Sequence, residues 1–132
     1  MGFRSKNSII VLSDLRAAEV AALAPPQPGF TYVTVTADYD LADGIDPVGT
    51  VSFTPSQPMV NDDTIVAAPV TRALDIDGIL LIDLAANTDP LTTPTGTFYT
   101  VTESINGVTR TYQRVVPYNA GSPVNLTDLE AP

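Results

Sequence analysis

The sequence predicts an all-β protein: a two-sheet β-sandwich of about seven short strands, preceded by an N-terminal arm that contains a short helix. Three observations lead to this prediction. From residue 30 onward, apolar and polar residues alternate with a period of two, as half-buried strands require. Twelve prolines and eight glycines divide the chain into short segments joined by turns. Hydrophobic residues make up 44% of the 132 residues, enough to build a core.

Residues 1–29 form the predicted arm. Ser13 is a typical helix N-cap, and an alanine-rich helix is predicted from there to residue 24, before two consecutive prolines. An isolated helix of about eleven residues is marginal in water, so we expect the arm to need a partner surface. The residues expected to form this assembly interface are Arg4, Lys6, Ile9, Ile10, Val11, Leu12, Leu15 and Leu23.

Residues 30–132 form the predicted sandwich domain. Asn106-Gly107 is the preferred pair for a type I′ turn, so the segments on either side should form a hairpin. The Asp75–Gly78 stretch is predicted as another hairpin turn, with Gly78 in the left-handed conformation. The predicted strands cover residues 32–38, 50–54, 64–67, 70–74, 79–84, 97–104 and 108–116, and residues 125–129 could add a short final piece.

The formal net charge of −9 is unevenly distributed. Residues 1–30 hold three basic and two acidic side chains, whereas the remainder holds three basic and thirteen acidic ones. Contacts with phosphate need clustered Lys and Arg, so neither a nucleic acid nor an anionic membrane surface is an expected partner. The apolar run at residues 9–12 is too short for the core of a signal peptide.

Cysteine and histidine are both absent from the sequence. This composition excludes disulfide bonds and zinc–thiolate sites, and it removes the commonest general acid/base and the commonest metal ligand. We therefore expect no enzymatic activity and no cofactor. Any chemistry would fall to carboxylates, tyrosines and the few basic side chains.

Four acidic residues, Asp38, Asp40, Asp43 and Asp46, gather around one predicted loop. Oxygen-rich loops of this kind can bind hard cations, so these residues are the candidate metal ligands. The alternative, which we favour, is a solvated acidic loop that keeps the protein soluble. The Asp75–Gly78 stretch resembles part of a calcium loop, but the further ligands of such a loop are missing, which favours a plain turn.

The predicted C-terminal hairpin places charged and aromatic side chains on one face. Arg110, Tyr112 and Arg114 alternate along one strand, and Tyr99 and Glu103 face the same way on its partner. The ordinary interpretation is a core of strand aromatics with a cross-strand pair between arginine and Glu103.

The order of several short motifs resembles a known group of modules. The motifs are Gly49-Thr50-Val51-Ser52-Phe53-Thr54-Pro55, Leu74-Asp75-Ile76-Asp77-Gly78, Phe98-Tyr99-Thr100-Val101-Thr102-Glu103, Asn106-Gly107, Arg110-Thr111-Tyr112 and Val116-Pro117. Over residues 30–129 this order resembles the Ig-like or prealbumin-like β-sandwich modules in minor tail proteins and other virion proteins of tailed phages that infect actinobacteria. The arm is not covered by the resemblance.

The resemblance implies a structural protein located in the virion. Its partners would be capsid or tail subunits, contacted through the arm, and it would be present in many copies or as a homo-oligomer. A module that stands nearly alone behind a short arm suits a capsid decoration protein or a small minor tail protein.

Two other functions remain open. One is a host-surface or glycan-binding module of a tail tip or fibre, with the loops at residues 40–46 or 87–96 as the binding surface. The other is a bacterial cell-surface adhesin-type repeat, because residues 99–103 also resemble collagen-adhesin B-type repeats. Some of those repeats carry a Lys–Asn isopeptide bond assisted by a Glu. This sequence departs from them, since its single lysine, Lys6, lies in the arm.

Overall fold

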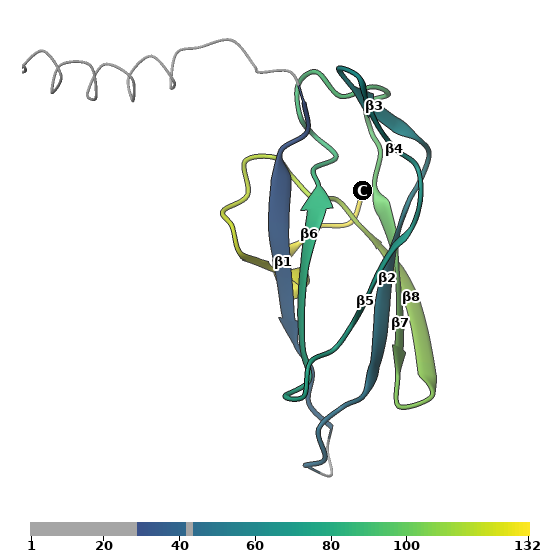
Figure 1. The fold of residues 1–132 in the computed structure, drawn as a ribbon, viewed down its shortest axis with the longest axis vertical. Coiled ribbons are helices and arrows are strands. Elements are labelled where there is room, and N and C mark those ends of the chain that lie inside the picture. Colours follow the sequence, from purple (N-terminus) through teal and green to yellow (C-terminus); the bar gives the residue numbers. More distant parts are fainter. Residues whose placement is uncertain (1–28, 42–43) are drawn as a thin grey trace, which may run out of the picture.

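The computed structural model describes residues 29–41 and 44–132, which form an all-β structure (Figure 1). Its strands are β1 (Tyr32–Asp38), β2 (Gly49–Pro55), β3 (Met59–Asn61), β4 (Thr64–Val66), β5 (Val70–Ala73), β6 (Ile79–Ala85), β7 (Tyr99–Ile105), β8 (Val108–Arg114) and β9 (Val124–Asn125), followed by a 3₁₀ helix, η1 (Leu126–Asp128). Within these described ranges, no helix has the length and apolar character needed to cross a membrane.

The strands build two larger sheets that face each other, as in a β-sandwich (Figure 1). One sheet has the order β6-β1-β9, and the other has the order β5-β2-β7-β8. A separate hairpin, β3-β4, lies between β2 and β5 in the sequence. The pairing is antiparallel throughout these sheets except for β1 and β9, which run parallel.

The predicted alternation is confirmed in both sheets. Val33, Val35 and Ala37 of β1 are buried, and so are Val51 and Phe53 of β2. Their side chains meet those of the facing sheet in a single core, because residues two apart in a strand point to the same face. The core also contains Met59, Leu80, Ile82, Leu84, Tyr99, Val101, Val116 and Leu126.

Tyr99, a buried residue of the core, connects the two sheets. Its ring meets the ring of Phe53 edge-on, with the centroids 6.2 Å apart and an interplanar angle of 88°. Its hydroxyl donates a 2.6 Å hydrogen bond to the carbonyl oxygen of Ala85 in the opposite sheet. Burial raises the pKa of this hydroxyl. A buried phenol with a satisfied hydroxyl thus contributes apolar area and a polar link at the same position.

The turn at Asp75–Gly78 is confirmed, but the predicted hairpin around it is wrong. Both the Asp77 and Ile79 amides donate to the Asp75 carboxylate at 2.9 Å, and Gly78 has a φ of 78°. However, β5 pairs with β2 whereas β6 pairs with β1, so the turn carries the chain from one sheet to the other. A turn signal is local, whereas the choice of partner strand depends on where the apolar face of β6 can be buried.

The second predicted hairpin is confirmed. Asn106 and Gly107 have φ values of 50° and 81°, and β7 and β8 pair in register from Ile105–Val108 outward. The turn is fixed to the neighbouring loop, because the Val48 amide donates to the Asn106 side chain at 2.8 Å and the Asn106 amide donates to the Val48 carbonyl.

Three other predictions need correction. The strand predicted at 64–67 is one half of a hairpin whose other strand, β3, was missed because it has only three residues. The predicted strands at 97–104 and 108–116 are shorter, as β7 begins at Tyr99 and β8 ends at Arg114. The final piece is mostly η1, capped by the Asn125 side chain, which accepts hydrogen bonds from Thr127.

The predicted helix at residues 13–24 lies outside the described residues. The same holds for all the assembly residues proposed from the sequence: Arg4, Lys6, Ile9, Ile10, Val11, Leu12, Leu15 and Leu23.

Candidate functional site

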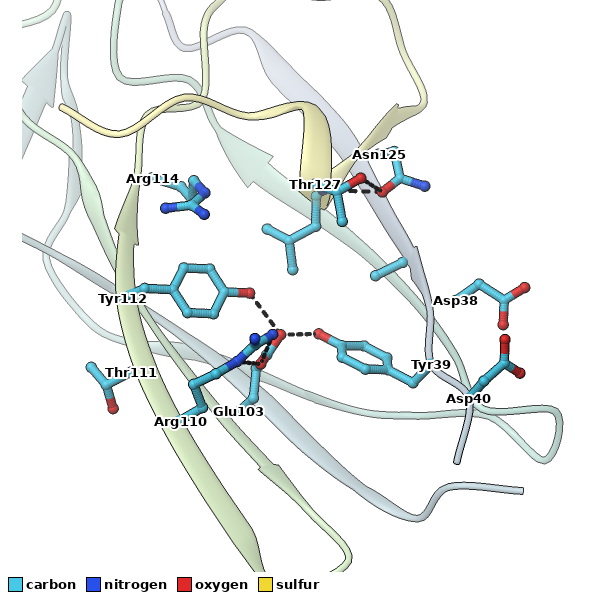
Figure 2. Close-up of a pocket in the computed structure, with 12 residues that line it drawn as sticks. Asp38, Tyr39, Asp40, Glu103, Arg110, Thr111, Tyr112, Arg114, Asn125 and Thr127 are labelled. Carbon is cyan, nitrogen blue, oxygen red and sulfur yellow. Dashed lines mark hydrogen bonds and ion pairs between the residues drawn. The ribbon is translucent and has the colours of Figure 1, made fainter. Parts of the chain in front are cut away.

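A groove of about 700 Å³ opens between the end of β1, the β7–β8 pair and the start of η1 (Figure 2). Asp38 and Asp40 lie on the β1 side, whereas the arginines and Tyr112 lie on the β8 side (Figure 2). The full lining is Ala37, Asp38, Tyr39, Asp40, Glu103, Arg110, Thr111, Tyr112, Arg114, Asn125, Leu126 and Thr127.

Glu103 lines this groove and is the acceptor on which its hydrogen bonds converge (Figure 2). The alternation of β7 directs its side chain inward, in the same row as Tyr99 and Val101, and only 3% of the residue is exposed. A buried carboxylate must be compensated by hydrogen bonds or opposite charge. Its Oε2 accepts hydrogen bonds from the hydroxyls of Tyr39, at 2.5 Å, and Tyr112, at 2.6 Å. Its Oε1 accepts a hydrogen bond from Nε of Arg110 at 2.7 Å and forms an ion pair with Nη2 of the same side chain, also at 2.7 Å.

These donors come from both sheets. Arg110 lies directly opposite Glu103 in the β7–β8 register, and Tyr112 lies two residues further along the same strand. Tyr39 follows the last residue of β1, in the other sheet. The hydrogen bond between Tyr39 and Glu103 therefore links the two sheets across the groove (Figure 2).

The cluster holds each group in one protonation state. Burial acts to raise the pKa of Glu103, but the hydrogen bonds from Tyr112, Tyr39 and Arg110 outweigh it and lower the pKa below its usual value of 4.5. Burial and the adjacent carboxylate raise the pKa of both tyrosine hydroxyls. The hydrogen bond and charge of Glu103 raise the pKa of Arg110. At neutral pH the carboxylate is thus ionised and its donors keep their protons.

Two arginines pack against the ring of Tyr112. The guanidinium carbons of Arg110 and Arg114 lie 5.2 Å and 4.6 Å from the ring centroid, within the range of cation–π attraction. The Arg110 side chain remains 69% exposed. Arg114 donates through Nη1 to the Gln113 carbonyl, while its Nε is buried and has no hydrogen-bond partner in the described part of the chain.

The hydrogen bonds of the cluster make Glu103 a poor general base. Every oxygen of the Glu103 carboxylate already accepts a short hydrogen bond, and its lowered pKa makes it a poor proton acceptor. The tyrosines hold their protons more firmly than a free phenol. What remains available to a ligand is the exposed part of Arg110, the Arg114 side chain and the acids on the opposite side.

The predicted acidic cluster is only partly brought together. Asp38 and Asp40 both line the groove, but Asp46 belongs to the segment before β2 and does not line it. Asp43 lies outside the described residues. Among residues 29–41 and 44–132, no three acidic side chains gather as a set of metal ligands.

The predicted arginine–glutamate pair is confirmed as Arg110–Glu103. The two tyrosine donors were missed. Tyr112 could have been found, since the predicted hairpin already placed it on the same face as Glu103. Tyr39 could not, because it is 64 residues away in the sequence and no local pattern connects it to Glu103.

A second groove, of about 420 Å³, is lined by the loop at residues 87–97 together with Val115 and Pro132. Beside it, the buried side chain of Asn87 accepts a hydrogen bond from the Val116 amide at 2.8 Å. This loop is one of the two proposed for ligand binding from the sequence, and its buried polar side chains serve mainly to fix the loop.

The two tyrosine hydroxyls can be tested separately. We expect Tyr39→Phe and Tyr112→Phe each to lower the free energy of unfolding by about 1 kcal/mol, because each removes one donor from a charged acceptor. Because the folded-state pKa of each tyrosine is raised above its unfolded value of 10, the stabilisation from its hydroxyl is fully present below pH 10. The stability difference between the parent and each variant should therefore be constant below pH 10 and should decline above it. Urea unfolding at pH 7 measures both variants, and additive losses in the double variant would contradict a shared acceptor.

Fold and groove together define an all-β, sandwich-like module with a polar groove built around a hydrogen-bonded carboxylate. No protein-family model matches the sequence, and no curated protein matches it significantly.

Proposed function

We propose that this protein is a structural protein of a bacteriophage virion. In this proposal an Ig-like or prealbumin-like sandwich is displayed on the particle, and residues 1–29 attach it to a neighbouring capsid or tail subunit. It would serve as a capsid decoration protein or a small minor tail protein. The motif order within residues 30–129 supports the phage setting.

The observation that carries the proposal is the anchored junction between the arm and the sandwich. The Gly29 amide donates to the side chain of buried Asn61 at 2.7 Å. The amide and hydroxyl of Thr31 donate to buried Asp89 at 2.7 and 2.8 Å. The first described residues are thus hydrogen-bonded to two buried side chains. A force applied to residues 1–28 would therefore be carried by these hydrogen bonds into the sandwich domain.

The way the sandwich is held together also supports a structural role. The sequence has no cysteine, so no disulfide joins the sheets. Instead, the Tyr39–Glu103 hydrogen bond and the hydrogen bond from Tyr99 to Ala85 connect them at two places. Among residues 29–41 and 44–132, the two buried acids, Glu103 and Asp89, both accept hydrogen bonds, and satisfied buried networks of this type rigidify a fold.

Deleting residues 1–24 tests the proposal. The truncated chain should keep the circular dichroism spectrum and cooperative unfolding of the full chain, because the anchored residues from Gly29 onward are retained. It should be absent from particles assembled in its presence, as measured by protein content of purified virions. Incorporation at the level of the full chain would contradict attachment through the arm.

A second function is favoured by one specific observation, the two arginines, Arg110 and Arg114, that line the β8 side of the groove. A sugar carboxylate or hydroxyl could accept hydrogen bonds from the exposed guanidinium of Arg110 and from the part of Arg114 that lines the groove, which fits the host-surface glycan module. Binding on a glycan array that is lost in Arg114→Gln but retained in Arg72→Gln, an exposed arginine of β5, would support it. The absence of any bound glycan would remove this alternative and leave attachment through the arm untouched.

A further inference from the structure

The free edge of β6 differs from the other sheet edges of the described structure. Edge strands expose unpaired backbone groups, and proteins protect them with short length, proline or charged side chains. β5 has four residues, follows Pro69 and carries Arg72. β8 carries Arg110 and Arg114, and β9 has only two residues and follows Pro123. β6, with the sequence ILLIDLA, is seven residues long, contains neither proline nor a basic residue, and carries one charge, Asp83.

The register with β1 shows which backbone groups of β6 are free. At the two ends of this pair, the Ala86 amide donates to the Thr31 carbonyl and the Tyr39 amide donates to the Gly78 carbonyl. Because hydrogen-bonded pairs alternate along an antiparallel ladder, the even-numbered residues of β6 bond to β1. The odd-numbered residues, Ile79, Leu81, Asp83 and Ala85, direct their amide and carbonyl groups away from it.

Two of these four residues are already engaged. Asp75 occupies both backbone groups of Ile79, and the Ala85 carbonyl accepts the Tyr99 hydroxyl. The amides and carbonyls of Leu81 and Asp83 have no partner within the described residues. β6 thus presents two consecutive free hydrogen-bonding positions at its centre, and the side chain between them, Ile82, points into the core.

We propose that β6 pairs with β6 of a second copy of this chain, antiparallel and about a two-fold axis through Ile82. In that register Leu81 lies opposite Asp83 of the second copy, and the reverse pair follows from the symmetry. The two pairs form four hydrogen bonds that use every free backbone group of Leu81 and Asp83. The β6-β1-β9 sheets of the two copies become one continuous sheet, which is strand addition with an identical partner.

The free groups of Leu81 and Asp83 flank Ile82 symmetrically, which favours an identical strand as the occupant, and the single charge on β6 selects the register. The protein is strongly acidic, so two copies repel each other over most of their surface. Along β6 the single acid, Asp83, is placed opposite an apolar side chain, Leu81, which is 60% exposed in one copy. A shift that centres the axis on Asp83 would place the two carboxylates directly opposite each other, which is unfavourable. In the proposed register they lie on the diagonal, roughly 7–8 Å apart.

Cysteine pairs provide the sharpest test, because the full-length chain has no cysteine of its own. The double variant Leu81→Cys/Asp83→Cys should form a covalent dimer on mild oxidation, since directly opposite positions fall within disulfide range. Each single variant should remain uncrosslinked, because the same position in the two copies is separated by the diagonal. Rapid crosslinking of either single variant would overturn the register.

Sedimentation of the full chain tests the association itself. We expect a monomer–dimer equilibrium that Leu81→Glu weakens by about tenfold or more, because it places a second carboxylate opposite Asp83, and that Asp83→Asn strengthens several-fold. Ile65→Glu is the matched control, since Ile65 is 66% exposed on the β3–β4 hairpin and its substitution should leave the equilibrium unchanged. A full chain that remains monomeric at about 0.1 mM, or a dimer insensitive to Leu81→Glu, would overturn the proposal. The pairing does not depend on the arm, so its failure and the failure of particle attachment are separate results.

Discussion

Glu103→Ala is expected to lower the free energy of unfolding by about 3 kcal/mol at pH 7, because it leaves the hydroxyls of Tyr39 and Tyr112 without their acceptor in a half-buried site. It also removes the link between the β1 side and the β7–β8 side of the groove. The exposed Arg110 can be hydrated, so it adds little to this loss. Urea unfolding followed by circular dichroism gives the difference, with Asp63→Ala, an exposed acid in the β3–β4 turn, as the control expected to stay within about 0.5 kcal/mol of the parent.

The pH dependence of stability separates the contribution of the Glu103 charge from that of its size. Glu103→Gln keeps the size of the side chain but cannot ionise. Because the folded-state pKa of Glu103 is lowered, its ionic contribution is fully present above its unfolded value of 4.5 and is lost as the pH falls through the folded value. The stability gap between the parent and Glu103→Gln should therefore be constant from pH 6 to 8 and should shrink below pH 4.5. A gap that stays constant down to pH 3 would contradict an ionised, stabilised carboxylate.

Phe53→Ala should have the largest effect on stability, a loss of about 3–5 kcal/mol, because it creates a cavity in the core. Phe53 is fully buried, and its ring packs edge-on against Tyr99, which itself bonds to the opposite sheet. The loss therefore includes apolar burial and the aromatic contact, and it loosens the positioning of Tyr99. Phe53→Leu retains most of the volume and should lose about half as much or less.

Thr54→Ala is the matched control for Phe53→Ala, since it lies next to Phe53 on β2 and faces solvent. It should change the unfolding free energy by no more than about 0.5 kcal/mol. The slope of the urea transition should be the same in all three variants if only the folded core is affected. Equal losses in Phe53→Ala and Thr54→Ala would mean that the two faces of β2 are not distinguished by burial.

Some parts of the fold could be predicted from the sequence because their cause is local. The alternation in β1 and β2 identifies the buried faces, and the Asn106-Gly107 pair specifies both the turn and the register of β7 with β8. Once that register is known, the pair between Glu103 and Arg110 follows. The three-residue strand β3 could not be found in this way, because so short a segment has no recognisable period.

The all-β class, the C-terminal hairpin and the Arg110–Glu103 pair were determined by the sequence itself, since each depends on residues close together in the chain. Only the tertiary structure decided that the Asp75–Gly78 turn connects the two sheets and that Tyr39 donates a hydrogen bond to Glu103. Both depend on which sheet each strand joins, and that choice follows from burying the apolar faces of strands far apart in the sequence. A buried carboxylate then takes its donors from whichever side chains this packing brings within hydrogen-bonding distance.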